Sequence, residues 1–131
     1  MIVVDASVLA TVVGDDGTDG RRARQELRVA GELAAPDLVD VETVAALRKR
    51  WLAGGLSARR FATAVDDLAD LDLDRFPTLP FLRRAWELRA SVTAYDAVYV
   101  ALAETLTCEL LTADRRLHQA HGPGCAVRLL V

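Results

Sequence analysis

The residues Ile2-Val3-Val4-Asp5 define the first element of the fold. Three consecutive apolar residues predict a short strand that is buried on both faces, and Asp5 ends it. The next segment, from Ala6 to Val13, has the spacing of a helix, which Gly14 closes. A buried strand that leads directly into a helix is the repeating unit of proteins with a parallel sheet.

The same alternation of strands and helices continues along the chain. Further strands are expected at residues 32–35, 71–76, 108–112 and 126–130. Further helices are expected at residues 21–30, 37–53, 57–69, 80–88, 94–105 and 114–120, with Asp37, Ser57 and Thr93 as predicted N-caps. Because crossovers between parallel strands are right-handed, we expect an α/β fold of three layers, with helices flanking a central, mostly parallel sheet.

Length and composition indicate one globular domain, residues 1–131. Of these residues 52% are hydrophobic and 27% are charged, which excludes a disordered tail, a collagen-like repeat and a disulfide-rich miniprotein. The sequence shows neither a basic leader nor an apolar run of about 18 residues, so we expect a cytoplasmic protein without a membrane span. Cys108 and Cys125 are then expected to be free thiols.

The net charge of −3 excludes a protein that wraps nucleic acid in a uniformly basic surface. The basic residues are nearly all arginines, and many of them are clustered. The clusters are Arg21-Arg22-Ala23-Arg24, Arg48-Lys49-Arg50, Arg59-Arg60, Arg83-Arg84 and Arg115-Arg116. Each is either a solvated helix face or a set of phosphate contacts, for which the planar guanidinium is well suited.

Four acidic residues are expected to approach one another at the carboxyl edge of the sheet. Asp5 and Asp114 follow the first strand and the strand at 108–112, while Glu42 and Asp96 lie in the early turns of helices that start at that edge. Ligand sites of open parallel sheets lie beyond the carboxyl ends of the strands. Taken singly, each acid has a structural alternative as a cap or a favourable charge at a helix N-terminus.

Glu42 and Asp96 are the hardest of these acids to explain by helix capping. Glu42 shares a helix face with apolar and small residues, and Asp96 is the only charged residue between Ala94 and Ala103. A buried carboxylate needs a cationic partner, and a divalent ion would supply one. Oxygen ligands without His or Cys favour Mg²⁺ or Mn²⁺. The hydroxyls of Ser7 and Thr112 are candidates to support such a site.

Together these residues resemble a known family. The matching segments are Ile2-Val3-Val4-Asp5-Ala6-Ser7, Glu42 in a helix after Pro36, Tyr95-Asp96-Ala97-Val98-Tyr99-Val100-Ala101-Leu102-Ala103 and Leu111-Thr112-Ala113-Asp114-Arg115-Arg116-Leu117. In this order they resemble the PIN-domain ribonucleases, and within them the VapC toxins of bacterial toxin–antitoxin pairs. The Asp-x-Ser at the start is weak by itself, whereas the ordered set is specific and spans nearly the whole chain.

The resemblance implies an endoribonuclease that depends on Mg²⁺ or Mn²⁺ and cuts structured RNA such as tRNA or ribosomal RNA. It implies that Asp5, Glu42, Asp96 and Asp114 are catalytic and hold the metal, with Ser7 and Thr112 in support. Some members carry a further acid at the position of Arg116, so its absence argues against a second metal ion. The resemblance also implies a cognate antitoxin. Arg115 and Arg116, beside this site, are candidate RNA contacts.

Two alternatives and one surface remain open at this level. A haloacid-dehalogenase-like phosphatase would carry a second aspartate at the position of Ser7, and a PIN-like module without activity would keep the same fold. On the helix at 37–53, Val44, Leu47 and Trp51 form an apolar stripe. We expect it to bind a partner helix or to form a homodimer, unless the helix at 57–69 covers it.

Overall fold

Five parallel strands form the centre of the molecule. The computed structural model describes residues 1–131. The strands are β1 (Ile2–Val4), β2 (Leu33–Pro36), β3 (Asp74–Phe76), β4 (Leu110–Thr112) and β5 (Val127–Leu129). Their order in the sheet is β3-β2-β1-β4-β5, and every neighbouring pair is parallel. The carboxyl ends of all the strands therefore lie at one edge, as the alternating pattern predicts.

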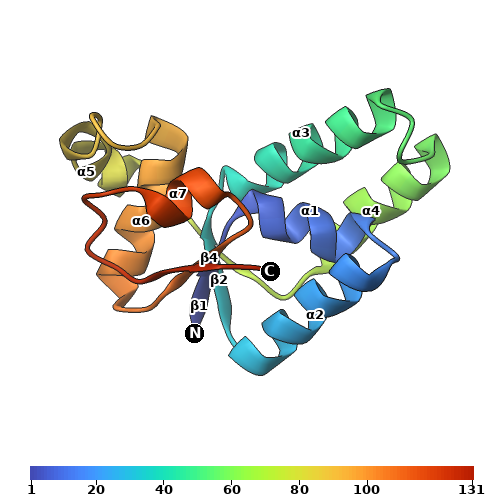
Figure 1. Ribbon diagram of the computed structural model, residues 1–131, viewed down its shortest axis with the longest axis horizontal. Coiled ribbons are helices and arrows are strands. Elements are labelled where there is room, and N and C mark those ends of the chain that lie inside the picture. The colour runs from blue at the N-terminus through green and yellow to red at the C-terminus, as the bar shows by residue number, and fades with distance from the viewer.

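Helices cover both faces of this sheet, which confirms the three-layer α/β fold. The helices are α1 (Ala6–Gly14), α2 (Thr18–Ala30), α3 (Val39–Leu52), α4 (Ala58–Asp70), α5 (Leu82–Glu87), α6 (Ala94–Leu106) and α7 (Arg115–Gln119), with a 3-10 turn at Leu79–Phe81. The first four helices lie on one side of the strands and the last three on the other (Figure 1). None of the helices is long and apolar enough to cross a membrane.

The core is built around β1 and α6. Val3 and Val4 are fully buried, since β1 is the middle strand and has helices over both of its faces. In α6 every residue from Ala97 to Ala103 is buried, and the helix packs against β1, β2 and β4. Asp96 directly precedes this buried run, so the packing of α6 determines where its carboxylate lies.

The structure departs from the predicted elements at several places; for example, α2 begins at Thr18, and the helix predicted at 80–88 is a 3-10 turn followed by the short α5. The strand predicted at 71–76 is paired only over Asp74–Phe76, because it lies at the sheet edge and pairs on one side only. The strand predicted at 108–112 begins at Leu110. Asp37 does not cap α3; its backbone N–H continues the β2–β3 pairing by donating to Phe76, and Leu38 precedes the helix without a side-chain cap.

Three arginines from three helices bind the carboxyl end of α1. Arg24 of α2 donates to the carbonyls of Val12 and Asp15, Arg50 of α3 donates to that of Ala10, and Arg60 of α4 donates to that of Val13. The last turn of a helix has unpaired carbonyls and the negative end of the helix dipole. One arginine from each of three sequence clusters thus has a structural role in place of the phosphate contact considered above.

The chain itself covers only part of the apolar stripe predicted on α3, since Trp51 remains 42% exposed. Leu47 is fully buried, and Trp51 lies against Phe61 of α4 with 6.5 Å between the ring centres. The expectation of a free stripe is therefore wrong for Leu47, because α1 and α4 both pack against α3. Cys108 and Cys125 are free thiols, as expected.

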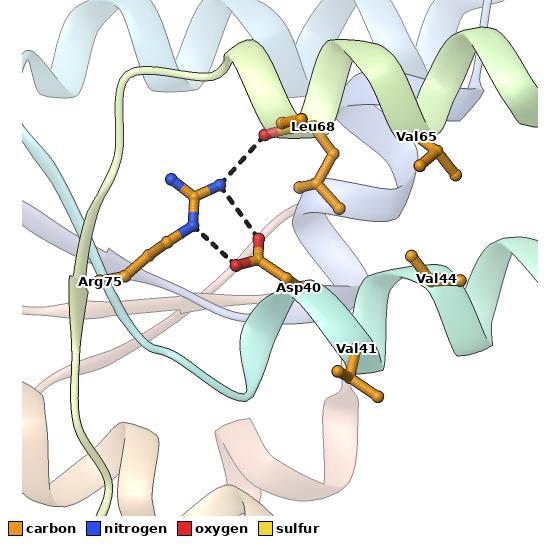
Figure 2. A pocket seen from close by; sticks show the side chains of 7 residues that line it. Asp40, Val41, Val44, Val65, Leu68 and Arg75 are labelled. Carbon is orange, nitrogen blue, oxygen red and sulfur yellow. Dashed lines mark hydrogen bonds and ion pairs between the residues drawn. The ribbon is translucent and has the colours of Figure 1, made fainter.

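A groove of about 530 Å³ remains open between α3 and α4. Figure 2 shows Val44 of α3 facing Val65 and Leu68 of α4, with an ion pair at one end, and Val41 of α3 is also among the lining residues. In that pair Arg75 donates to both carboxylate oxygens of Asp40, at 2.7 and 3.0 Å. The groove is apolar, and Val41 is 75% exposed.

Candidate active site

Asp5 is the most deeply buried acid at the carboxyl edge of the sheet, with 7% of its surface exposed. It precedes α1 but makes no capping hydrogen bond to that helix. Its Oδ2 instead accepts hydrogen bonds from the hydroxyls of Ser7, at 3.0 Å, and Thr112, at 2.6 Å. The capping alternative is therefore wrong for Asp5, whose Oδ1 remains available to a ligand.

The same two hydroxyls join the end of β4 to the end of β1. The backbone N–H of Ala113 donates to Ser7 Oγ, and that of Asp114 donates to Thr112 Oγ1, each at 3.0 Å. Each hydroxyl thus accepts from one strand end and donates to the carboxylate of Asp5. The network orients Asp5 and positions the backbone of Asp114, and it places Ser7 and Thr112 against the carboxylate of Asp5.

Glu42 approaches the same edge from the first turns of α3. Its Oε1 accepts a 2.7 Å hydrogen bond from the hydroxyl of Tyr99 on α6. The ring of Tyr99 is fully buried, and burial together with the nearby carboxylates raises the pKa of its phenol. Tyr99 therefore remains a neutral donor, and the acceptor is the carboxylate of Glu42.

Asp96 and Asp114 line one cavity of about 230 Å³, together with Arg116. The rest of its wall comes from Ser91, Val92, Thr93 and Leu117. Asp114 caps α7, since its Oδ1 accepts from the backbone N–H of Arg116 at 2.8 Å. The capping alternative is correct for Asp114, but only one of its carboxylate oxygens is used in this way.

The electrostatics of the site are dominated by burial and by repulsion among its carboxylates. Burial, followed by the charges of Asp5 and Asp96, raises the pKa of Glu42 above its ordinary value, although the hydrogen bond from Tyr99 opposes this. Burial and the charge of Asp5 likewise raise the pKa of Asp96, with a further contribution from Asp114 and an opposing one from Arg116. The four acids are thus close enough to repel one another, and a cation would relieve that repulsion.

The donor set fits a hard divalent cation. All four acids supply oxygen, which Mg²⁺ and Mn²⁺ prefer. No three acidic, histidine or cysteine side chains lie close enough together to hold one ion directly. Mg²⁺ commonly binds through one or two carboxylates and keeps several water molecules, so such an ion does not require three close side-chain ligands.

Tyr99 is a further residue of the site that the spacing of the acids does not reveal. It lies within the segment from Tyr95 to Ala103, between apolar neighbours. The available signal was a phenol in a helix that is otherwise apolar, because a buried tyrosine hydroxyl usually has a hydrogen-bond partner. The structure also separates two neighbours that were considered together: Arg116 lines the cavity with Asp96, whereas Arg115 does not.

A family model places the chain among known proteins. The model of the PIN domain matches residues 2–122. Ribonuclease VapC9 of Mycobacterium tuberculosis is 40% identical over 130 residues, an alignment that covers 99% of this chain and 98% of that protein. Ribonuclease VapC1 of the same organism is 37% identical over 129 residues, covering 98% of this chain and 96% of that protein.

Solved structures show the same fold at lower identity. VapC20 of M. tuberculosis, described as a toxin that cleaves the sarcin–ricin loop, is 17% identical with a TM-score of 0.68. That match covers 89% of this chain and 92% of VapC20. A chain of a toxin–antitoxin complex from Klebsiella pneumoniae is 18% identical, also with a TM-score of 0.68, over 100% of this chain and 98% of that one.

Proposed function

Since the chain belongs to the PIN-domain family and, within it, to the VapC ribonucleases, we propose that it is an endoribonuclease toxin that requires Mg²⁺ or Mn²⁺. Its substrate is structured RNA such as tRNA or ribosomal RNA, and the cleavage inhibits translation. The proposal rests chiefly on one observation: four acids gather at the carboxyl edge of the sheet, where Ser7 and Thr112 hold Oδ2 of Asp5 and where Asp96 and Asp114 line one cavity. The family match argues against the haloacid-dehalogenase-like alternative.

The carboxylates of Asp5, Asp96 and Asp114 would hold the metal ion, directly or through water, and Glu42 would bind it or orient a water molecule. When bound, such an ion lowers the pKa of a coordinated water and neutralises charge on a phosphodiester. Ser7 and Thr112 fix Oδ2 of Asp5, so its other oxygen is presented in one orientation. A water molecule oriented by Glu42 attacks phosphorus in line, and the 3′ oxygen of the preceding nucleotide leaves, giving a 5′-phosphate and a 3′-hydroxyl.

The RNA backbone would approach the site past Arg116. This arginine lines the cavity with Asp96 and Asp114, and its charge lowers the pKa of Asp96. A guanidinium in this position can bind a phosphate that the carboxylates would otherwise repel. Cleavage in a loop fits a small, open cavity, because loops present unstacked nucleotides.

We further propose that an antitoxin encoded beside this chain binds and inhibits it, as the toxin–antitoxin complexes of the same fold suggest. The groove between α3 and α4 supports this proposal, since its walls are apolar and Val41 is largely exposed. An amphipathic helix would bury its apolar face there. The homodimer expected from the sequence remains a prediction, which light scattering on the purified chain tests.

Cleavage of a mixed tRNA and ribosomal RNA sample by the purified chain tests the function. We expect cleavage with Mg²⁺ or Mn²⁺, no cleavage with EDTA, and recovery when the metal is restored. The products should carry 5′-phosphates. Cleavage that persists in EDTA and leaves 2′,3′-cyclic phosphates would contradict the proposal, because that product arises by attack of the ribose hydroxyl.

A further inference from the structure

Three of the four carboxylates at the sheet edge share a pattern in their hydrogen bonds. Asp5 has Oδ2 held by two hydroxyls, Asp114 has Oδ1 held by a backbone N–H, and Glu42 has Oε1 held by Tyr99. In each case one oxygen is bound by the protein and the other is left without a protein donor. A carboxylate held in this way presents a single, oriented oxygen to a ligand.

Glu42 depends on this arrangement more than the two aspartates do. Its side chain has one more rotatable bond, and the bond from Tyr99 is the only hydrogen bond that its carboxylate accepts from the protein. The donor is rigid, because the ring of Tyr99 is fully buried within the run of buried residues in α6. Tyr99 also lies one helical turn after Asp96, so one helix carries both an acid of the site and the group that orients another.

We propose that Tyr99 is a positioning residue: its hydroxyl fixes Oε1 of Glu42 and so directs Oε2 toward the metal ion or the attacking water. This inference rests on the proposed function and assigns Tyr99 a role within the same site. Tyr99 itself touches neither the metal nor RNA. Its contribution is to keep Glu42 in one rotamer across the gap between α6 and α3.

The test is the substitution Tyr99→Phe, which removes the hydroxyl and keeps the buried ring. Tyr95→Phe is the matched control, since Tyr95 is on the same helix and is 65% exposed. We expect Tyr99→Phe to lower either the affinity for Mn²⁺ or kcat for RNA cleavage by roughly 10- to 100-fold. The affinity is measured by calorimetry without RNA. The KM for RNA should change little. Tyr95→Phe should match the wild type in both measurements.

A double-mutant cycle separates positioning from a general effect on packing. In a Glu42→Ala background the hydroxyl has no carboxylate to orient, so Tyr99→Phe should cause no further loss of affinity or kcat. Wild-type affinity and kcat in Tyr99→Phe, or an equal loss in the Glu42→Ala background, would overturn the inference. Failure of the wild type itself to bind Mn²⁺ and cleave RNA would instead overturn the proposed function.

A second measurement applies if Tyr99→Phe does not fold. The wild-type chain is labelled with 3-fluorotyrosine, and the ¹⁹F signal of residue 99 is assigned by comparison with Tyr95→Phe. Mg²⁺ should shift the signal of residue 99 along the calorimetric binding curve and leave that of residue 95 in place. An unchanged signal of residue 99 at saturating Mg²⁺ would overturn the inference. It would show that binding of the ion does not alter the hydrogen bond between Tyr99 and Glu42.

Discussion

The hydroxyl of Thr112 donates a 2.6 Å hydrogen bond to Oδ2 of Asp5, joining the ends of two neighbouring strands whose residues are 107 positions apart. Both side chains are buried, so water does not compete for this bond. It couples the fold to the site, because the pairing of β1 with β4 and the orientation of the Asp5 carboxylate depend on the same hydroxyl.

Thr112→Val should therefore damage both stability and metal binding. Valine has nearly the shape of threonine but cannot donate, and a hydrogen bond to a charged group contributes about 1.5–3 kcal/mol. We expect a loss of that size in the free energy of unfolding, measured in urea, together with weaker Mn²⁺ binding. Thr112→Ser keeps the hydroxyl and should retain most of the affinity; equal affinity for the valine and serine variants would contradict this account.

Asp96→Asn should stabilise the metal-free protein at neutral pH. The folded pKa of Asp96 is raised by burial and by Asp5, so its carboxyl binds a proton more tightly in the folded than in the unfolded state. The protonated carboxyl of Asp96 therefore stabilises the fold at pH values below its ordinary pKa of 3.8. This stabilisation is lost as the pH rises through the raised pKa of the folded state. Thermal unfolding in EDTA should show a higher midpoint for the variant at neutral pH.

The pH dependence provides the check on this prediction. The advantage of Asp96→Asn over the wild type should shrink as the pH is lowered toward 3.8, because the wild-type carboxyl becomes protonated. Mg²⁺ should raise the midpoint of the wild type at neutral pH and have much less effect on the variant. A variant that is less stable than the wild type in EDTA at neutral pH would show that Asp96 has a stabilising partner.

Arg116→Ala should weaken RNA binding and its dependence on salt. Loss of one phosphate contact to single-stranded RNA lowers the slope of log affinity against log salt by about 0.7. Arg83→Ala is the control, since Arg83 lies on α5 and contacts Trp86. Arg84 is unsuitable as a control because it pairs with Glu104 at 2.9 Å and its loss would destabilise the fold. An unchanged slope for Arg116→Ala would show that Arg116 makes no contact with an RNA phosphate.

Val41→Glu should weaken antitoxin binding without unfolding the chain. Val41 is 75% exposed on a wall of the groove, so a charge there meets the partner and changes stability by only about 0.5 kcal/mol or less. Val29→Glu on α2 is the matched control, since Val29 is 77% exposed and outside the groove. Calorimetry with the neighbour-encoded protein measures both; equal affinity for the two variants would exclude this groove as the binding surface.

The sequence predicts best those features in which one strong local signal agrees with the fold. Ile2–Val4 and the apolar helix from Ala94 are such features, because burial on all sides leaves a continuous apolar run. The acids at the strand ends could be inferred because a parallel sheet brings its carboxyl ends to one edge. The sequence puts Thr112 near Asp114, whereas its hydrogen bond to Asp5 depends on the pairing of β1 with β4.

Other features depend on contacts between distant residues and carry little local signal. The pairing of Tyr99 with Glu42 spans 57 positions and requires α3 and α6 to reach the same edge of the sheet from its two sides. Leu47 was assigned to a free stripe because periodicity shows that a helix has two apolar faces but not which neighbour covers each. The arginines of α2, α3 and α4 could not be assigned to the end of α1 without the packing of those helices.

Single-turnover cleavage of a labelled RNA by Asp96→Asn in saturating Mg²⁺ tests the central claim most directly. The matched control is Asp66→Asn, an exposed acid on α4 outside the site. We predict that Asp96→Asn remains folded and loses at least about 100-fold in rate, since a carboxylate that holds the catalytic ion is removed, whereas Asp66→Asn cleaves like the wild type. Cleavage by Asp96→Asn at the wild-type rate would contradict the assignment of this site.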